Sequence, residues 1–328
     1  MKVNWGLIGC GDISKRRVAP ALRDLDNCNL VSVNRSQFEL AEDFAKEFGA
    51  KKWYKTWQEL IKDEKINAVY ISTPVYLHAE MTIAAAEAGK HVLCEKPMAM
   101  NVNECDRMIS ACKTNNVKLG IAYYRNFYPA VRRVKEIISS GELGEISCAQ
   151  INIFGYFDRK PGEPRSWLLE KKKSGGGPMY DIGCHRLEVF LNIFGPVKDV
   201  KGQVSNVLFQ RNVEDTGTAL LLFDSNVHGV LSVGHAAKES QDTLDIFGSE
   251  GSIRIAVLNQ GDMIIKSSKG ERKESFPPHE NFHLPLIDDF ANSILEDREP
   301  VVDGLIGREV NRLLMAICSN PPRRKTTQ

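Results

Sequence analysis

The sequence lacks the features that would mark a membrane protein or a disulfide-rich fold. No apolar run approaches the roughly 18 residues of a membrane span, and the N-terminal run is too short and too interrupted by glycine for a signal peptide. The eight cysteines are scattered without a CxxC pair, which is typical of reduced, mostly buried thiols rather than a disulfide framework or a zinc ribbon. We therefore expect a cytoplasmic protein with no membrane partner and no bound metal.

The chain also lacks an excess of charge of either sign. Its 43 lysines and arginines oppose 42 aspartates and glutamates, which leaves a formal net charge of +1. Nucleic acids and anionic membranes attract proteins through concentrated positive charge, so we expect neither as a partner. With 328 residues, and roughly 100 to 200 residues in a typical domain, the chain is long enough for two domains.

What the sequence does contain is a glycine turn close to its start. A short apolar run ends at Gly9, and Gly11 follows before a helix-compatible segment. Glycine lacks a Cβ, so the backbone can bend sharply and a pyrophosphate can meet the N–H groups at the helix N-terminus. Ser14 departs from the third position of the dinucleotide fingerprint, which leaves an ordinary strand-to-helix turn as the alternative. The turn residues expected to face a cofactor are Gly9, Gly11, Asp12 and Ile13.

Strands and helices then alternate along the first part of the chain. Apolar runs bounded by turn residues predict strands, and apolar residues at helical spacing predict helices that end at caps or glycines. Such alternation gives right-handed crossovers and a parallel sheet that binds ligands outside the carboxyl ends of its strands. The predicted strands cover residues 3–8, 30–33, 68–72, 91–94 and 117–122, and the predicted helices include residues 38–48, 77–88 and 101–115.

Beyond residue 122 the pattern changes to consecutive strands joined by short turns, which should pair antiparallel. These predicted strands cover residues 146–157, 197–209, 216–223, 227–233, 244–247 and 252–255. We therefore predict an α/β chain with two domains. Residues 1–122 form a dinucleotide-binding Rossmann domain with a doubly wound parallel sheet. Residues 123–328 form an α+β substrate-binding and oligomerisation domain with a large open, mainly antiparallel sheet, whose C-terminal helices pack back toward the first domain. An open sheet face commonly becomes a subunit interface, so we expect a homodimer or homotetramer.

The residues at the end of the second strand bear on the choice of cofactor. A carboxylate usually stands there to bind the adenosine ribose, but this chain has Asn34, Arg35 and Ser36. A guanidinium and a hydroxyl would attract a 2′-phosphate that a carboxylate would repel, which favours NADP over NAD. The alternative is that Arg35 is a solvated loop residue that stacks on the adenine of either cofactor.

Residues 71–98, ISTPVYLHAEMTIAAAEAGKHVLCEKPM, resemble the glucose–fructose oxidoreductase, inositol 2-dehydrogenase and rhizopine-catabolism family, written Gfo/Idh/MocA. In that family a TPxxxH segment leads through an alanine-rich helix to an AGKHVxxEKP strand end. This chain matches both motifs, the first at Thr73, Pro74 and His78 and the second over residues 88–97.

The resemblance implies an NAD(P)-dependent oxidoreductase that transfers hydride to or from a secondary alcohol or carbonyl of a sugar, inositol or related polyol. It also implies that Lys96 lies beside the nicotinamide ribose and the reacting carbon. Glu95, His78 and the Thr73-Pro74 turn would then line the cofactor. The family includes a repressor that kept the fold and lost the chemistry, so a catalytically inactive cofactor-binding regulator is the alternative.

A helix predicted over residues 180–194 carries polar residues along one side. Asp181, His185, Glu188 and Asn192 follow spacings of four, three and four, so they form either a solvent face or the wall of a polar pocket. The family motif GGGxxxDxGxH matches residues 175–185. The resemblance implies that Asp181 and His185 are catalytic, in a site shared with Lys96 and built from both domains. Whether Lys96 or His185 takes the proton stays open.

Other residues have lesser or competing interpretations. Tyr124 and Arg125 resemble the family crossover between domains and are candidate substrate contacts, together with Trp167. His279 to His283 satisfies the HExxH pattern of zinc peptidases, but two prolines precede it and no third ligand follows at a recognised spacing. Cys184 points about 100° away from His185 around the helix, so we expect a buried thiol rather than a nucleophile.

Overall fold

A computed structural model describes residues 1–319, 323 and 324. The chain divides into two compact units. The first combines Met1–Tyr124 with His279–Asn311, and the second combines Arg125–Pro278 with the chain from Arg312 onward. The division into domains at residues 122 and 123 stays a prediction.

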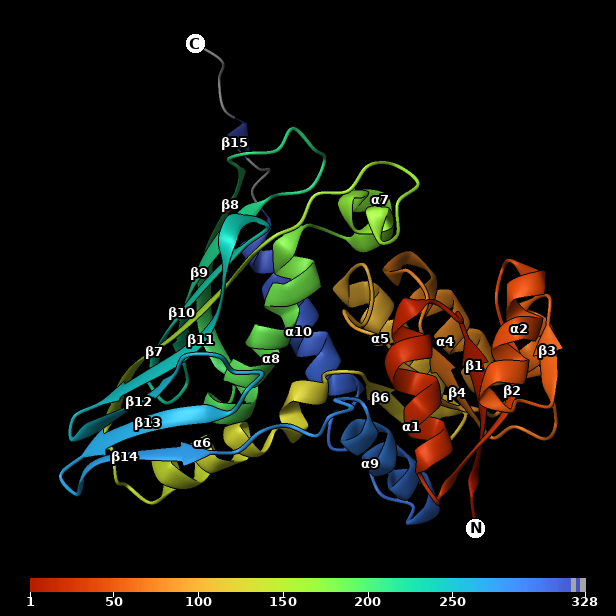
Figure 1. The fold of residues 1–328 in the computed structure, drawn as a ribbon, viewed down its shortest axis with the longest axis horizontal. Helices are drawn as coiled ribbons and strands as arrows, with labels where there is room; N and C mark the ends of the chain where they lie inside the picture. The colour runs from red at the N-terminus through yellow and green to blue at the C-terminus, as the bar shows by residue number, and fades with distance from the viewer. Residues whose placement is uncertain (320–322, 325–328) are drawn as a thin grey trace. The chain divides into compact units, whose positions relative to one another are not determined.

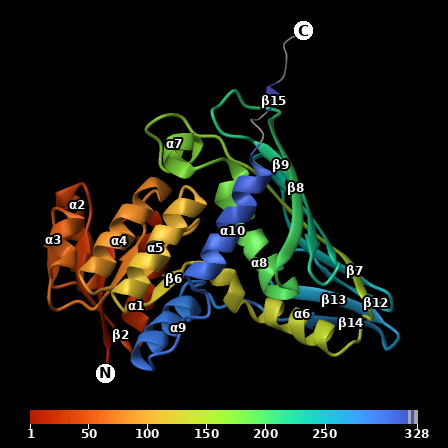
Figure 2. The same cartoon turned by 180° about the vertical axis from the view of Figure 1, so that it is seen from behind.

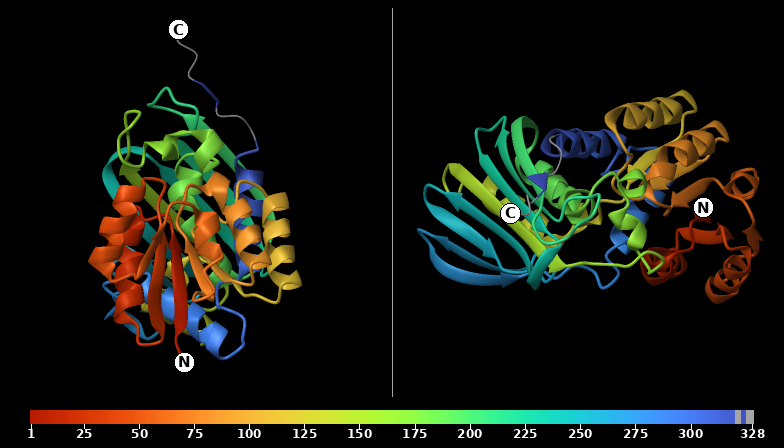
Figure 3. Two further views of the ribbon diagram at one scale, coloured as in Figure 1. Left: turned by 90° about the vertical axis from the view of Figure 1, so that its right-hand side faces the viewer. Right: turned by 90° about the horizontal axis from the view of Figure 1, so that it is seen from above.

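The first unit is built on a six-stranded parallel sheet in the order β3-β2-β1-β4-β5-β6. Helices cover both faces of this sheet (Figures 1 and 3). Strand order reverses beside β1, so the turns after β1 and β4 leave the same edge at the point where doubly wound sheets bind ligands. The strands are β1 Val3–Ile8, β2 Cys28–Asn34, β3 Lys52–Tyr54, β4 Ala68–Ile71, β5 His91–Cys94 and β6 Leu119–Ile121, and the helices are α1 Ala19–Asp24, α2 Phe38–Phe48, α3 Trp57–Ile61, α4 His78–Glu87, α5 Val102–Thr114 and α9 Leu284–Leu295.

The segment from His279 to Asn311 belongs to the core of the first unit. The Phe290 ring on α9 packs against Trp5 of β1, with ring centroids 5.7 Å apart. Gly120 in β6 allows this approach, because a Cβ there would lie 2.6 Å from the Phe290 ring. Both aromatic side chains are almost fully buried, so α9 closes one face of the parallel sheet.

The second unit is built on a nine-stranded sheet in the order β14-β13-β12-β11-β7-β10-β9-β8-β15. Its pairs are antiparallel except β10 with β7 and β15 with β8. Helices α6 and α8 lie on one face, as Figure 1 and the reverse view in Figure 2 show, and no helix of the described chain covers the other face of this sheet. The elements are α6 Pro129–Ser139, β7 Ile146–Tyr156, α7 Lys171–Ser174, α8 Cys184–Phe194, β8 Val197–Asn206, β9 Thr216–Phe223, β10 His228–Gly234, β11 Ala236–Gly248, β12 Gly251–Ile255, β13 Asp262–Ser267, β14 Gly270–Ser275 and β15 Arg323–Arg324, while α10 Gly304–Ile317 runs from the first unit into the second.

The predicted fold class is therefore confirmed, with corrections in detail. Strands β3, β13 and β14 were not predicted, and β11 is longer than its predicted core of residues 244–247. The helix predicted over residues 180–194 begins with a π-helical turn, Met179–Gly183. All eight cysteines are free, and no described helix combines the length and apolarity needed to cross a bilayer.

Candidate active site

The turn after β1 uses its two glycines differently. Gly9 has a left-handed φ of +92°, and a Cβ there would lie 2.7 Å from the carbonyl oxygen of Ser72 after β4. The Ser14 hydroxyl donates to the Gly9 carbonyl over 2.6 Å and also contacts the Ser72 hydroxyl, so the serine at the third fingerprint position ties the turn to β4. By contrast, nothing lies within 4 Å of the place that a Cβ of Gly11 would take.

The residues after β2 lie beside this turn. Arg35 Nη1 donates to the Cys10 carbonyl over 2.9 Å, so the guanidinium is held on the glycine turn. Asn34 is buried, and its amide donates to the Tyr54 carbonyl over 3.0 Å, which joins β2 to β3. Ser36 is exposed, as are Gly11 and Asp12 in the glycine turn, whereas Ile13 is half-buried.

His78 joins the turns that follow β4 and β5. Its ring is fully buried, with Nε2 2.9 Å from the Thr73 carbonyl oxygen and Nδ1 3.1 Å from the Pro97 carbonyl oxygen. Burial lowers the pKa of His78, although both carbonyls act in the opposite direction. Because backbone groups occupy both ring nitrogens, the side chain positions the turns that carry Thr73 and Lys96.

Glu95, at the end of β5, is a buried carboxylate surrounded by donors. Its Oε1 accepts from the Tyr70 hydroxyl over 2.9 Å and lies 3.3 Å from His283 Nε2, while Oε2 accepts from the Lys96 backbone N–H over 3.2 Å. Burial raises the pKa of Glu95, but the hydrogen bonds and the His283 and Lys96 charges outweigh it and leave the pKa below its ordinary value. Lys96 therefore follows an ionised carboxylate. The ring of His283 also packs on Tyr124, with centroids 4.8 Å apart.

The HExxH interpretation is not supported. Residues 279–283 form a turn before α9 rather than a helix, so the two histidines are not displayed one helical turn apart. The described residues contain no group of three or more His, Cys, Asp or Glu side chains that could hold a metal ion. His283 instead pairs with Glu95, which the spacing of the motif could not reveal.

In the second unit, the glycine run precedes the helix with the predicted catalytic residues. A Cβ on Gly177 would lie 2.0 Å from the Glu214 carbonyl oxygen, so this glycine admits neighbouring backbone. Asp181 lies in the π-helical turn, and His185 follows in the first turn of α8. His185 is only 4% exposed and Glu188 only 1%, which excludes the solvent-face alternative.

Two cationic or donor side chains approach the same oxygen of Asp181. Arg165 Nη2 lies 3.4 Å from Oδ2, and His235 Nε2 lies 3.5 Å from it. The Arg165 guanidinium also stacks on the Phe157 ring, 4.9 Å from its centroid. His235 comes from the junction of β10 and β11, and no sequence motif marked it. Trp167, a predicted substrate contact, is half-buried in the short helical turn Ser166–Leu169.

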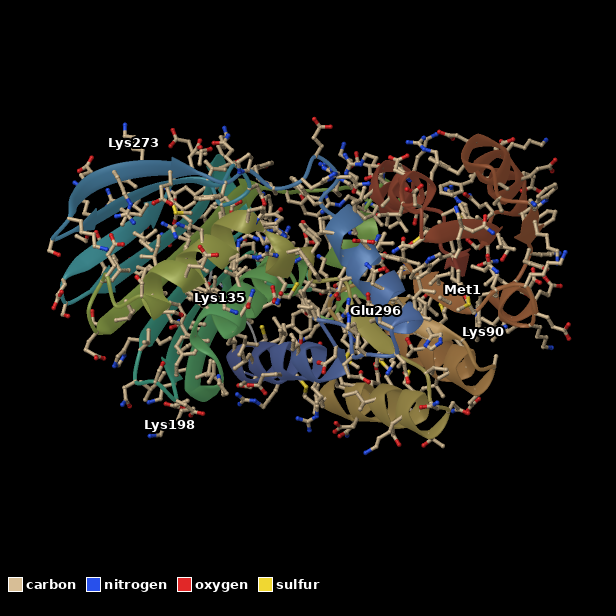
Figure 4. All side chains as sticks on the ribbon, turned by 90° about the horizontal axis from the view of Figure 1, so that it is seen from below. Met1, Lys90, Lys135, Lys198, Lys273 and Glu296 are labelled. Carbon is tan, nitrogen blue, oxygen red and sulfur yellow. The ribbon has the colours of Figure 1, made fainter. Side chains whose placement is uncertain are left out.

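Glu188 differs from Glu95 in having few donors. Its Oε1 accepts from Asn126 Nδ2 over 2.6 Å, whereas Oε2 has no hydrogen-bond partner in the described chain. Burial raises the pKa of Glu188 to about 8, against the opposing effects of Asn126, Arg125 and Lys135. Lys135, labelled on α6 in Figure 4, donates to Asn192 over 2.8 Å. Arg125, a predicted substrate contact, is buried beside this carboxyl group.

Comparison with known proteins assigns the family. A model described as "Oxidoreductase family, NAD-binding Rossmann fold" matches residues 3–123, and one for the "GFO/IDH/MocA C-terminal domain" matches residues 131–254. An oxidoreductase of Formosa agariphila is 31% identical over 301 residues, which cover 88% of this chain and 89% of the relative. The chain belongs to the Gfo/Idh/MocA family.

Other members of the Gfo/Idh/MocA family show the same extent of similarity. A D-xylose 1-dehydrogenase [NADP(+)] of Haloarcula marismortui is 30% identical over 312 residues, 92% of this chain and 86% of the relative. The structure of a levoglucosan dehydrogenase in complex with NADH and levoglucosan has a TM-score of 0.88 at 25% identity, over 97% of each chain. These matches support an NAD(P)-dependent oxidoreductase, and the two relatives do not share one cofactor.

A matched pair of variants tests the separate roles of the two glycines, Gly9 in stability and Gly11 in cofactor binding. Gly9→Ala should lower the free energy of unfolding by about 1–3 kcal/mol, because its φ is left-handed and backbone fills the Cβ position. Gly11→Ala should leave stability unchanged and weaken NAD(P) binding by about tenfold, because a methyl group would stand where the pyrophosphate approaches. Chemical denaturation and fluorescence titration measure the two effects. Undiminished NAD(P) affinity in Gly11→Ala would contradict this role of the turn.

The pKa of Glu188 predicts a pH dependence of stability. Between its ordinary value of 4.5 and about 8 the folded protein keeps a proton that the unfolded chain releases. The free energy of unfolding should therefore fall as pH rises through this window, by on the order of a few kcal/mol. Glu188→Gln should remove that part of the fall, whereas the exposed Glu239→Gln should not. Urea denaturation from pH 5 to 9 tests this, and parallel profiles for wild type and Glu188→Gln would show that Glu188 is ionised in the fold.

Proposed function

We propose that this protein transfers hydride between nicotinamide C4 and a secondary alcohol or carbonyl carbon of a sugar, inositol or related polyol. The observation that carries the proposal is the position of Lys96. It lies just beyond the carboxyl end of β5, directly after the buried, ionised Glu95. Doubly wound sheets bind their cofactor outside that edge. The relatives named for activity on D-xylose and levoglucosan support the substrate class.

The first unit has features that fit a dinucleotide. The backbone at Gly11 is open, and Arg35 is held on the Cys10 carbonyl of the same turn. These residues would hold the pyrophosphate and the adenosine end, while the Thr73-Pro74 turn, Glu95 and Lys96 would line the nicotinamide end. The bound nicotinamide supplies or accepts the hydride. His78 acts indirectly, because its buried ring fixes the Thr73 and Pro97 carbonyls.

The remaining chemistry falls to Lys96, Asp181 and His185. Oxidation of a secondary alcohol needs a base for the hydroxyl proton and a positive or donor group that stabilises the developing carbonyl oxygen. His185 and Lys96 are both suited to hold that proton, and the Lys96 ammonium can polarise the oxygen. The ionised Asp181 carboxylate can orient the substrate hydroxyl. Arg165 and His235, which lie near its Oδ2 atom, favour this ionised form.

The cofactor proposed is NADP rather than NAD. No carboxylate follows β2, Arg35 has a fixed guanidinium and Ser36 is exposed beside it. A fixed guanidinium binds a phosphate at smaller entropic cost than a freely rotating side chain. We also propose that copies of the chain associate through the uncovered face of the second sheet, where Leu220 and Phe247 are 57% and 37% exposed.

Cofactor choice can be tested at Arg35. Arg35→Asp should weaken NADP binding by roughly 1.5 to 3 kcal/mol or more, because it removes one charged hydrogen-bonded contact and adds a repulsion. NAD binding should change little. Fluorescence titration of the wild type and Arg35→Asp with NADP and with NAD measures this. A wild-type protein that binds NAD at least as tightly as NADP would overturn the preference.

Catalysis can be tested at the proposed residues. Lys96→Ala should lower turnover by roughly 100-fold or more, as loss of an acid–base group does, while cofactor affinity stays within about tenfold. Asp181→Ala and His185→Ala should do likewise, with unfolding transitions that remain cooperative. Lys113→Ala, an exposed lysine on α5, is the matched control and should have wild-type turnover. The assignment fails if Lys96→Ala or His185→Ala turns over a sugar or polyol substrate at nearly the wild-type rate.

A further inference from the structure

We propose that His235 is a positioning residue, which holds Asp181 ionised and oriented and is itself fixed by Arg211. The inference rests on the proposed function, because it concerns the carboxylate assigned there to the substrate. No sequence motif includes His235. Its role is inferred from the atoms that lie near its two ring nitrogens.

The His235 ring is buried against Phe157. It is 3% exposed, and its centroid lies 5.0 Å from that of Phe157. Its backbone N–H donates to the Asp215 carbonyl over 2.8 Å, and its own carbonyl accepts from the Phe157 N–H over 2.9 Å. The two ring nitrogens therefore have fixed directions, one toward Asp181 and one toward Arg211.

These directions select one tautomer. Nδ1 lies 3.3 Å from Arg211 Nη2, and a guanidinium nitrogen can only donate. Nδ1 must therefore carry the lone pair, which places the imidazole proton on Nε2. Nε2 lies 3.5 Å from Asp181 Oδ2, so the same ring that accepts from Arg211 offers its N–H to the carboxylate. Such separations commonly shorten when a substrate completes the site.

Arg211 is itself fixed, so it can hold the ring in this state. Its Nη1 donates to the Phe157 carbonyl over 3.1 Å, and its Nη2 donates to the Glu214 carbonyl over 3.1 Å. Asp215 organises the loop that carries Arg211 by accepting the backbone N–H groups of residues 207, 208 and 209. The result is a directional chain in which Arg211 donates to His235 and His235 Nε2 lies 3.5 Å from Asp181 Oδ2.

Other charged groups surround this chain and must be considered with it. Arg165 approaches the same Asp181 oxygen from a half-exposed loop, and Arg159 stacks on the other member of the ring pair, Phe157. Burial lowers the pKa of Arg211, and the negative charges of Asp215, Asp158 and Glu214 act in the opposite direction. Arg186 forms a separate ion pair with Asp242. The His235 side chain is 4% exposed and the Arg165 side chain is 48% exposed, so the His235 contact with Asp181 is the more buried of these two.

Two substitutions separate the two ring functions. His235→Gln can place an N–H donor near the position of Nε2, whereas His235→Asn can keep an acceptor near Nδ1 but is too short to reach Asp181. We expect His235→Asn to lower kcat about tenfold, the effect of one hydrogen bond to a charged group. The acidic limb of its pH–rate profile should move to higher pH, because the Asp181 anion loses a donor. His235→Gln should recover most of both effects, and NAD(P) affinity should be unchanged in each variant.

His228→Asn is the matched control, because His228 lies exposed at the start of β10. It should match the wild type in kcat and in its pH profile. A merely structural role for His235 would lower the unfolding temperature of both variants without a pH shift. Equal pH profiles for wild type, His235→Gln and His235→Asn would overturn the inference.

A second measurement is independent of activity. In protein labelled with ¹⁵N-histidine, NMR should show His235 in the neutral Nε2–H tautomer, and Arg211→Met should remove that preference. Observation of the Nδ1–H tautomer or of an imidazolium at neutral pH would contradict the chain of donors. Asp181→Asn separates the two proposals: wild-type turnover in that variant would refute the role of Asp181 in the proposed function, even if the tautomer is as expected.

Discussion

A buried carboxylate needs several donors to stay ionised. In the first unit the buried carboxylate is Glu95, and the surrounding residues supply its donors. Isolation of a carboxylate from water costs several kcal/mol unless hydrogen bonds or charges replace the lost hydration. Tyr70 from β4, the Lys96 backbone and His283 from the segment before α9 supply those interactions. The C-terminal segment that carries His283 is thus bound to the same sheet edge as the EKP strand end. Fold and chemistry depend on one set of contacts there.

The second unit shows the same physics with two outcomes on one helical segment. Asp181 lies near donors on Arg165 and His235, which favour its anion. Glu188, about two turns further on, accepts a side-chain hydrogen bond only from the Asn126 amide among the described residues and has a pKa raised to about 8, so near neutral pH it holds a proton. Asp181 lies within the π-helical turn Met179–Gly183, and π-turns often accompany functional sites. Environment rather than residue type assigns the charge.

Local signals in the sequence were sufficient for much of the fold. The αL glycine at Gly49 ends α2, and the Thr56–Glu59 capping box begins α3. Strands such as β3, with three residues, and β13 and β14, with little alternation, form because neighbouring strands pair with them. A short polar segment carries no periodicity that would reveal such pairing.

Prediction of the site had the same limit. The family motifs marked Lys96, Asp181 and His185, and the glycine turn marked the entrance to the first helix. The contacts of His235 and His283 were not predicted, since each lies beside a residue far away in the sequence: His283 beside Glu95 and His235 beside Asp181. The HExxH spacing even drew attention to His283 for the wrong chemistry. Only three-dimensional contacts distinguish a positioning histidine from a motif match.

The proposed function depends on direct movement of hydride between a carbinol carbon and nicotinamide C4. Sugars and polyols deuterated at their carbinol carbons, incubated with the protein and NADP or NAD, test this most directly. One deuterium should appear at C4 of the reduced cofactor, detected by mass spectrometry, together with a ketone or lactone product. Cofactor reduction without deuterium at C4, or no reduction with any sugar or polyol by a protein that binds the cofactor, would contradict it.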